Sequence, residues 1–245
     1  MPTLQYESLM QLTPALAFSY CGDYLSSKDV IYIQGKRGSL ADMDIDCDGV
    51  QNGPANDGRC SVSRSPDYQD TTAFQDTIVR YRAGITDLNA YVHPYVVFGN
   101  TGSKSGWRTF DPTSVGVRPL SVMAVVCGDN LVYGVWGDTN GDDGSHPMVG
   151  EASISLATAC YGDSMTGSNG HSQTDVLYLA FTGKDAVPGA KGANWNASDF
   201  DAFEKSIEQL GDRLVEGLKS SASRPPVEWR VVFAVGMLGM ILIAI

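Results

Sequence analysis

Two carboxylic acids, Asp138 and Glu151, have the residue types and surroundings that acid–base chemistry requires. They lie in the stretch WGDTNGDDGSHPMVGEASISL, residues 136–156. Asp138 follows a run of apolar residues, and Glu151 opens the strand-like run Glu-Ala-Ser-Ile-Ser-Leu. Two strand ends joined by a glycine-rich loop can face two carboxylates across a cleft. Glycosidases use such a pair, with one carboxyl protonated as acid and the other ionised as base or nucleophile.

The same stretch also imitates the start of a calcium-binding loop, because Asp138, Asn140 and Asp142 alternate. Such a loop needs a bidentate Glu at its twelfth position, and that position is Val149. Glu151 comes two residues too late, so we assign no metal ligand here. Trp136 could offer a stacking face to a sugar ring, although a buried strand tryptophan is the commoner role.

A second acidic cluster, DMDIDCDG, spans residues 42–49. In an extended strand alternate side chains share one face, so the apolar members would face the core. The other face would then carry a row of carboxylates, Asp44, Asp46 and Asp48. A row of like charges repels itself unless a cation lies along it. Three interpretations of this row remain: it binds a calcium ion, it binds a cationic substrate, or it is a solvated edge with turns before Gly49. The calcium loop is only a partial match, because its twelfth position would be Ala55 and not Glu.

Composition restricts the class of partner. The chain has 245 residues, 28 acidic against 17 basic, and a formal net charge of −11. Nucleic-acid binding requires clustered Lys and Arg, so we expect no nucleic-acid partner. An acidic cleft would instead attract a polycation. Only one domain is expected from this length, and we expect a monomer that needs no cofactor.

Five cysteines without Cys-x-x-Cys spacing, and three scattered histidines, make a structural zinc site improbable. They fit an oxidising compartment, with two disulfides and one odd thiol. We expect Cys47 to pair with Cys60 and Cys127 with Cys160, which leaves Cys21 unpaired. The sequon at Asn196 agrees with secretion.

Short apolar runs rich in Val, Ile and Tyr predict strands at residues 30–33, 95–98, 120–126, 131–136, 152–157 and 175–181. The tetrapeptide Cys127-Gly-Asp-Asn130 predicts a tight hairpin turn. Apolar residues at helical spacing predict one long helix over residues 199–219, which would pack on the core. The expected fold class is therefore mainly β (α+β), a β-barrel or sandwich with a C-terminal packing helix.

Both ends of the chain differ from this middle part. Residues 1–24 are a segment of uncertain status. A signal peptide has Lys or Arg before its apolar run, but no Lys or Arg precedes the apolar run 9–20. Residues 220–245 combine a polar spacer with an uncharged tail too short for a typical membrane span. A glycosylphosphatidylinositol-anchor signal is the preferred interpretation, ahead of a tail anchor or a spurious end. We expect a secreted protein, with possible membrane attachment through this tail.

The sequence resembles the fungal chitosanases of glycoside hydrolase family seventy-five. The resemblance is carried by DMDIDCDG at 42–49 and VWGDTNGDDGSHPMVGEASISLA at 135–157. It covers residues from about 25 to 218, and the expected catalytic domain is 25–219. It implies endo-hydrolysis of chitosan, the β-1,4-linked glucosamine polymer, with inversion. It also places the two essential carboxylates on Asp138 and Glu151, and implies a compact β-barrel, with the double-psi type as one candidate.

We assign Glu151 as the general acid and Asp138 as the water-activating base, because a loop residue should be better solvated and stay ionised. The roles could also be exchanged. With this resemblance, Asp44, Asp46 and Asp48 become an edge for substrate ammonium groups. Two alternatives are a calcium-stabilised carbohydrate-binding or cell-wall protein without turnover, and a hydrolase of another polysaccharide.

Overall fold

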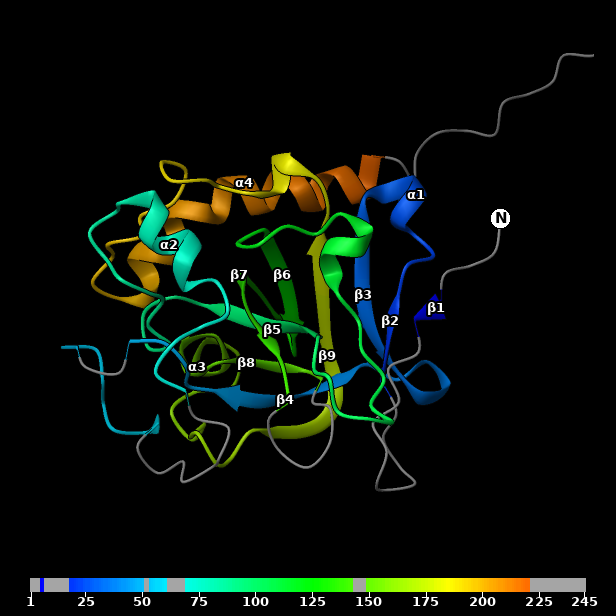
Figure 1. Cartoon of the computed structure of the whole chain (residues 1–245), viewed down its shortest axis with the longest axis horizontal. Helices are drawn as coiled ribbons and strands as arrows, with labels where there is room; N and C mark the ends of the chain where they lie inside the picture. Colours follow the sequence, from blue (N-terminus) through cyan, green and yellow to red (C-terminus); the bar gives the residue numbers. More distant parts are fainter. Residues whose placement is uncertain (1–4, 7–17, 51–52, 61–68, 143–148, 221–245) are drawn as a thin grey trace, which may run out of the picture.

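A mixed β-sheet forms the centre of the chain, and a long C-terminal helix covers part of it (Figure 1). The structure is a computed structural model and describes all residues except 1–4, 7–17, 51–52, 61–68, 143–148 and 221–245. The strands are β1 (Gln5–Tyr6), β2 (Phe18–Cys21), β3 (Val30–Gly35), β4 (Ala41–Asp46), β5 (Tyr95–Asn100), β6 (Val122–Cys127), β7 (Asn130–Asn140), β8 (Glu151–Ser153) and β9 (His171–Phe181). The helices are α1 (Leu25–Lys28), α2 (Gln75–Tyr81), α3 (Ile154–Tyr161) and α4 (Phe200–Ser220), with short 3₁₀ turns η1 (Lys36–Gly38), η3 (Pro112–Val115) and η4 (Lys184–Ala186).

The strands are paired in the order β1-β2-β3-β9-β4-β8-β5-β7-β6, and β9 also pairs with β6. Two pairs are parallel, β4 with β8 and β5 with β7, and the others are antiparallel. This order places β5, which is buried along its whole length, between the strands that carry Asp138 and Glu151. The protein is therefore mainly β with added helices, as the spacing of the apolar runs predicts.

The predicted long helix is confirmed as α4, which begins and ends within one residue of the predicted range. Its apolar side packs against β6 and β7, with Phe203 and Ile207 fully buried. Five of the six predicted strands lie within β3, β5, β6, β7 and β9 or overlap them. The predicted hairpin is also confirmed, since Cys127 pairs with Asn130 across a two-residue turn.

The predicted strand over residues 152–157 is wrong in its second half. Strand β8 ends at Ser153, and α3 begins at Ile154. Ser153 is the N-cap of this helix, and its hydroxyl accepts the backbone N–H of Leu156 (3.4 Å). A short apolar run that is buried on all sides does not distinguish strand from helix by its period, which explains the error.

Both expected disulfides, Cys47–Cys60 and Cys127–Cys160, are present, and Cys21 is a buried free thiol. Strand β2, within the first 24 residues, pairs with β3. Most of the C-terminal segment, from residue 221 on, lies outside the described residues. Among the helices that the structure describes, none combines the length and the apolar character that crossing a bilayer requires.

Candidate active site

Asp138 and Glu151 lie on the two strands that flank β5, at the same level of the sheet. Val97 of β5 pairs with Asp138 on β7 and with Glu151 on β8. Directly paired residues present their side chains on one face. Because neighbouring strands are about 4.8 Å apart, the two backbones are separated by roughly 9.6 Å at this level. Side chains leaving those backbones can hold carboxyl groups at the separation of about 6.5–9.5 Å that inverting glycosidases use.

Gly137 brings Asp138 to this level. The pairing between β5 and β7 shifts by one residue between Val96 and Val97, as in a β-bulge. A Cβ atom on Gly137 would come within 2.5 Å of the Cβ of Tyr95, so the backbones approach more closely than another residue would permit. The bulge therefore depends on glycine, and it sets which residue of β7 faces Glu151 across β5.

Two neighbouring residues, Gly150 and Asn140, fix the position of Glu151. Gly150, with φ of +94°, precedes it in a conformation that favours glycine, and its backbone lies close to Asp42. The amide Nδ2 of Asn140 donates to Oε2 of Glu151 (2.6 Å). On the neighbouring strand β4, Asp44 pairs with Glu151 and is exposed. The Glu151 carboxyl thus has an amide donor on one side and the open acidic strand on the other.

Asp138 is fixed by backbone donors. Its Oδ1 accepts the N–H groups of Ala73 (2.9 Å) and Thr139 (2.7 Å). The side chain is only 6 % exposed, and Glu151 is 7 % exposed. The premise that Asp138 sits on a better-solvated loop is therefore wrong, because the residue lies inside β7, which continues to Asn140. Solvation does not separate the two carboxyls.

The acidic segment 42–49 converges on Asp138. Within β4 the alternation is confirmed, with Ala41 and Met43 buried and Asp44 exposed. Beyond the strand, Asp46 Oδ1 accepts the backbone N–H of Asp48 (2.7 Å), which turns the chain toward β7. One oxygen from each carboxyl group of Asp46, Asp48 and Asp138 lies within 4.8 Å of the others. The structure therefore groups Asp46 and Asp48 with the base candidate, and places Asp44 beside Glu151.

The surroundings of Asp138 disfavour its ionisation. Burial raises the pKa of Asp138 well above its usual value, and the charges of Asp46 and Asp48 raise it further, against the two backbone donors. Burial also raises the pKa of Asp46 to about 6. Such a cluster favours a cation in its vicinity. Three oxygens could share a metal ion, but calcium takes about six to eight oxygen ligands.

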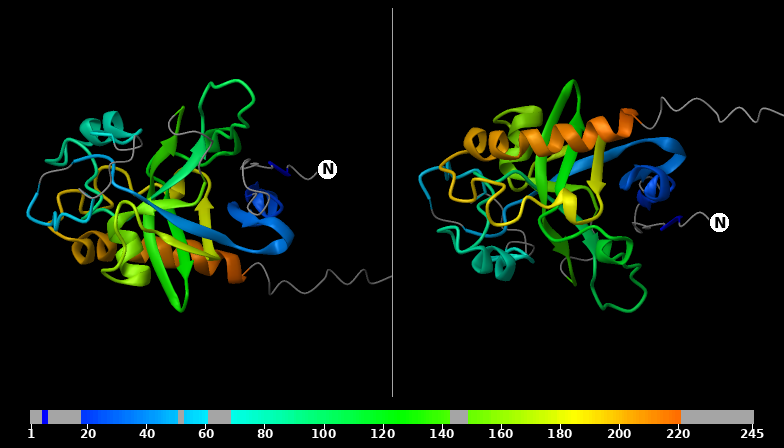
Figure 2. Two further views of the ribbon diagram at one scale, coloured as in Figure 1. Left: turned by 90° about the horizontal axis from the view of Figure 1, so that it is seen from below. Right: turned by 90° about the horizontal axis from the view of Figure 1, so that it is seen from above.

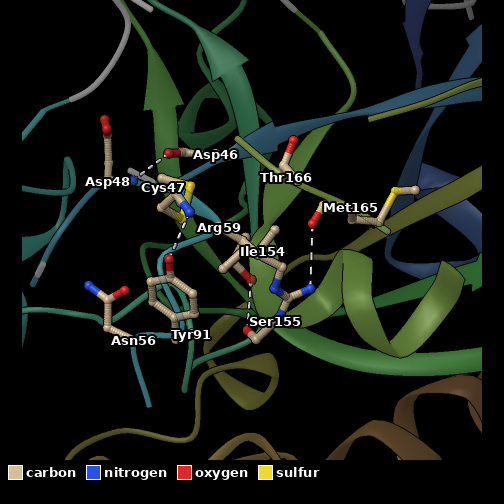
Figure 3. The surroundings of a disulfide bond; sticks show 12 residues. Asp46, Cys47, Asp48, Asn56, Arg59, Tyr91, Ile154, Ser155, Met165 and Thr166 are labelled. Carbon is tan, nitrogen blue, oxygen red and sulfur yellow. Dashed lines mark hydrogen bonds between the residues drawn. A yellow bond between two sulfur atoms is a disulfide. The ribbon is translucent and has the colours of Figure 1, made fainter. Parts of the chain in front are cut away.

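The Cys47–Cys60 disulfide restrains the segment that carries Asp46 and Asp48. Cys47 lies between Asp46 and Asp48 (Figure 3). On the other side of the bridge, the backbone N–H of Cys60 donates to Tyr91 Oη (2.7 Å), and Arg59 Nη1 donates to Thr158 Oγ1 of α3 (2.8 Å). The disulfide therefore connects the acidic segment to the helix that follows Glu151.

Trp136, expected as a possible sugar platform, is not available to a ligand. Its side chain is 2 % exposed and packs edge-on against Phe74, with ring centroids 4.7 Å apart. Its indole N–H donates to the backbone oxygen of Asp138 (2.8 Å). The substrate-binding assignment is wrong, and Trp136 instead supports the backbone of a catalytic candidate from the core.

Asn140 is the site residue that sequence reasoning missed. The calcium-like alternation of residues 138–142 accounts for its position but gives it no partner. Residues two apart on a strand share a face, so the same alternation places Asn140 on the face of Asp138. That signal was present in the sequence. The contact with Glu151 depends on the order of the strands, which the sequence does not reveal.

Comparison with known proteins identifies the family of this chain. The family model described as "Fungal chitosanase of glycosyl hydrolase group 75" matches residues 43–217. The chain is 48 % identical over 207 residues to an endo-chitosanase of Aspergillus oryzae, covering 83 % of this chain and 78 % of the relative. It is 47 % identical over 205 residues to an endo-chitosanase of Aspergillus fumigatus, with the same coverage. Endo-chitosanase B of A. oryzae is 46 % identical over 205 residues, again covering 83 % and 78 %.

Proposed function

Because the chain belongs to the fungal chitosanases of glycosyl hydrolase group 75, we propose that it hydrolyses β-1,4 bonds inside chitosan chains with Asp138 and Glu151. It is a glycoside hydrolase of that group, and its relatives are named endo-chitosanases. The observation that supports the proposal most strongly is the pairing of Val97 with both acids, which spaces their backbones for an inverting mechanism.

In the proposed mechanism Asp138 is the base and Glu151 is the acid. A base must be ionised and oriented, and two backbone N–H groups aimed at Oδ1 of Asp138 serve both purposes. Asp138 would take a proton from water as the water attacks the anomeric carbon from one side. Glu151, with Asn140 donating to one oxygen, would give its proton from the other oxygen to the leaving sugar.

The raised pKa of Asp138 opposes its ionisation in the free protein, and bound substrate would lower this pKa. Chitosan carries an ammonium group on each deacetylated unit, and Asp46 and Asp48 would bind one beside Asp138. The added positive charge would neutralise the cluster and lower the pKa of Asp138. A larger fraction of Asp138 would then be ionised in the complex, which favours glucosamine over acetylated units. Asp44 would bind an ammonium on the Glu151 side.

The test is incubation of the protein with chitosan, with reducing ends and product sizes followed over time. Rapid loss of polymer length with few small products is expected for endo-cleavage. Binding without new reducing ends would overturn the proposal, and would favour the alternative of a calcium-stabilised carbohydrate-binding protein. The clustered oxygens of Asp46, Asp48 and Asp138 are the observation that favours this alternative. In that case a chelator would lower the melting temperature sharply.

Asp46→Asn is expected to move the acidic limb of the kcat/KM profile to lower pH. The sign follows from the cluster: a base loses activity as pH falls through its pKa, and the Asp46 charge raises the pKa of Asp138. Removing that charge lowers this pKa. Because kcat/KM reports the free enzyme and kcat the complex, the shift in kcat should be smaller.

Asp44→Asn is the matched control, since it removes the same charge from the same strand outside the cluster. It should raise KM and leave the acidic limb in place. A shift of the alkaline limb with Asp46→Asn would instead mean that Asp138 is the acid.

For the finer fold we propose a closed barrel of the double-psi type. The pairing of β6 with β9 supports it, because it joins the two ends of the row β9-β4-β8-β5-β7-β6. We also propose a secreted monomer; the C-terminal tail through which it would attach to a membrane lies outside the described residues. The two disulfides and the exposed sequon residue Asn196 support secretion.

A further inference from the structure

The loop of residues 101–109 leaves the sheet directly beside the candidate site and projects from it (Figure 2). Its base is closed by Asn100 and Phe110, whose backbone groups exchange hydrogen bonds of 3.0 and 2.8 Å. At its start, the N–H of Thr101 donates to the backbone oxygen of Asn140 (2.7 Å). Asn140 is the residue whose side chain contacts Glu151, so the loop begins one contact away from the proposed acid.

Asp142 holds the first half of this loop in place. Its Oδ1 accepts the backbone N–H groups of Ser103 (2.5 Å) and Lys104 (2.8 Å), and its Oδ2 accepts the Ser103 hydroxyl (2.5 Å). Asp142 follows Asn140 by two residues, so the loop is held next to the site at two points. A loop fixed in this way can present side chains to a polymer with little loss of conformational entropy on binding.

The loop presents one large aromatic side chain, Trp107, with a cation on its ring. The Nζ atom of Lys104 lies 4.5 Å from the ring centroid of Trp107. Lys104 is exposed and Trp107 is partly exposed, in contrast to Trp136, which the core encloses. Indole faces attract ammonium groups and cover apolar surface, and a glucosamine unit offers both an ammonium group and an apolar ring face.

We propose that Trp107 is a platform for a glucosamine unit distant from the cleaved bond, and that Lys104 occupies this platform until the substrate replaces it. The inference rests on the proposed function and adds a specificity-determining residue to it. The amine of Lys104 stands in for the amine of the substrate. The exchange replaces one cation on the ring with another, so the platform selects deacetylated units.

Trp107→Ala is expected to raise KM for a glucosamine hexamer by up to about 30-fold, the upper end of a cation–π contact of about 0.5–2 kcal/mol, with kcat nearly unchanged. The displaced Lys104 contact offsets part of the lost cation–π contact, but nothing offsets the lost apolar contact with the sugar ring. Trp107→Phe should lie between, because a smaller ring attracts cations less strongly. Melting temperatures establish that both variants are folded. A KM unchanged in both variants would overturn the platform.

Lys104→Gln is expected to lower KM, because the competing cation is gone. The matched control is Lys184→Gln in η4, which makes the same change in net charge at an exposed residue outside the loop. A lower KM only in Lys104→Gln supports the exchange. Equal changes of KM in both lysine variants would mean that only net charge matters. A raised KM in Lys104→Gln would mean that Lys104 binds the substrate. Either result overturns the proposed exchange of Lys104 for the substrate. Failure of the proposed function is distinct, since the unaltered protein would then show no turnover.

Discussion

Glu151→Gln should lower kcat on chitosan by about 10²- to 10⁴-fold, the range that a positioned acid or base contributes. The amide keeps the size of the side chain and can still face Asn140, but it cannot give a proton to the leaving sugar. The fold should be unchanged, because the carboxyl belongs to the site and not to the core. Initial rates of reducing-end release, with melting temperature as the check on folding, measure the effect.

Asp138→Asn should cause a loss of similar size, and the double variant should lose little more, because the two groups act in one reaction step. Asp129→Asn is the control, since it removes one carboxylate in the turn between β6 and β7. Its rate should equal that of the unaltered protein. If either site variant retained full activity, the assignment of the pair would be wrong.

Removal of the Cys47–Cys60 disulfide is expected to damage the site more than the fold. The bridge closes 13 residues, so the double Ser variant should lose about 3 kcal/mol in the free energy of unfolding. Asp46 and Asp48 flank Cys47, and displacing them by as little as about 1 Å should lower kcat on the order of tenfold to a hundredfold. Urea unfolding and kcat, both measured well below the melting transition, give the two values.

The second disulfide provides the matched comparison. Cys127–Cys160 closes 33 residues, so its removal should cost roughly 1 kcal/mol more in stability by the entropy of the longer loop. It joins the β6–β7 hairpin to the end of α3, and neither of its cysteines adjoins Asp46 or Asp48 in the chain. Its variant should therefore lose more stability and less activity. Equal losses of kcat would mean that the first disulfide acts only through stability.

The sequence predicts those parts of the site that depend on local pattern. Alternation predicts a row of Asp44, Asp46 and Asp48 opposite a core face, and the structure confirms it only in part. Met43 is buried and Asp44 exposed, but Asp48 lies beyond β4 and is buried. The positions of Asp138 and Glu151 at strand segments follow from apolar runs, which also suggest that the two carboxyls form an acid–base pair. The family resemblance implies the same pair. The expected pairing of the cysteines is also confirmed, although the sequence alone does not fix their connectivity.

The remaining features depend on which strands become neighbours. Nothing local to Asp138 shows that β5 separates it from Glu151, or that Asp46 and Asp48 approach it from a segment about ninety residues earlier. For the same reason the sequence does not reveal the burial of Asp138, because the exposure of a strand end depends on which segments pack against it. Trp107 and Asn140 acquire roles only through the loop contacts that β5 and β7 create.

The most direct test of the central claim is the configuration of the first product. Proton NMR spectra taken during early hydrolysis of a glucosamine hexamer distinguish the α- and β-anomers of the new reducing end before they equilibrate. The spacing of Asp138 and Glu151 across β5 leaves room for a water, so the α-anomer should appear first. Appearance of the β-anomer first would contradict the account, because it would require a covalent intermediate on one of the two carboxylates.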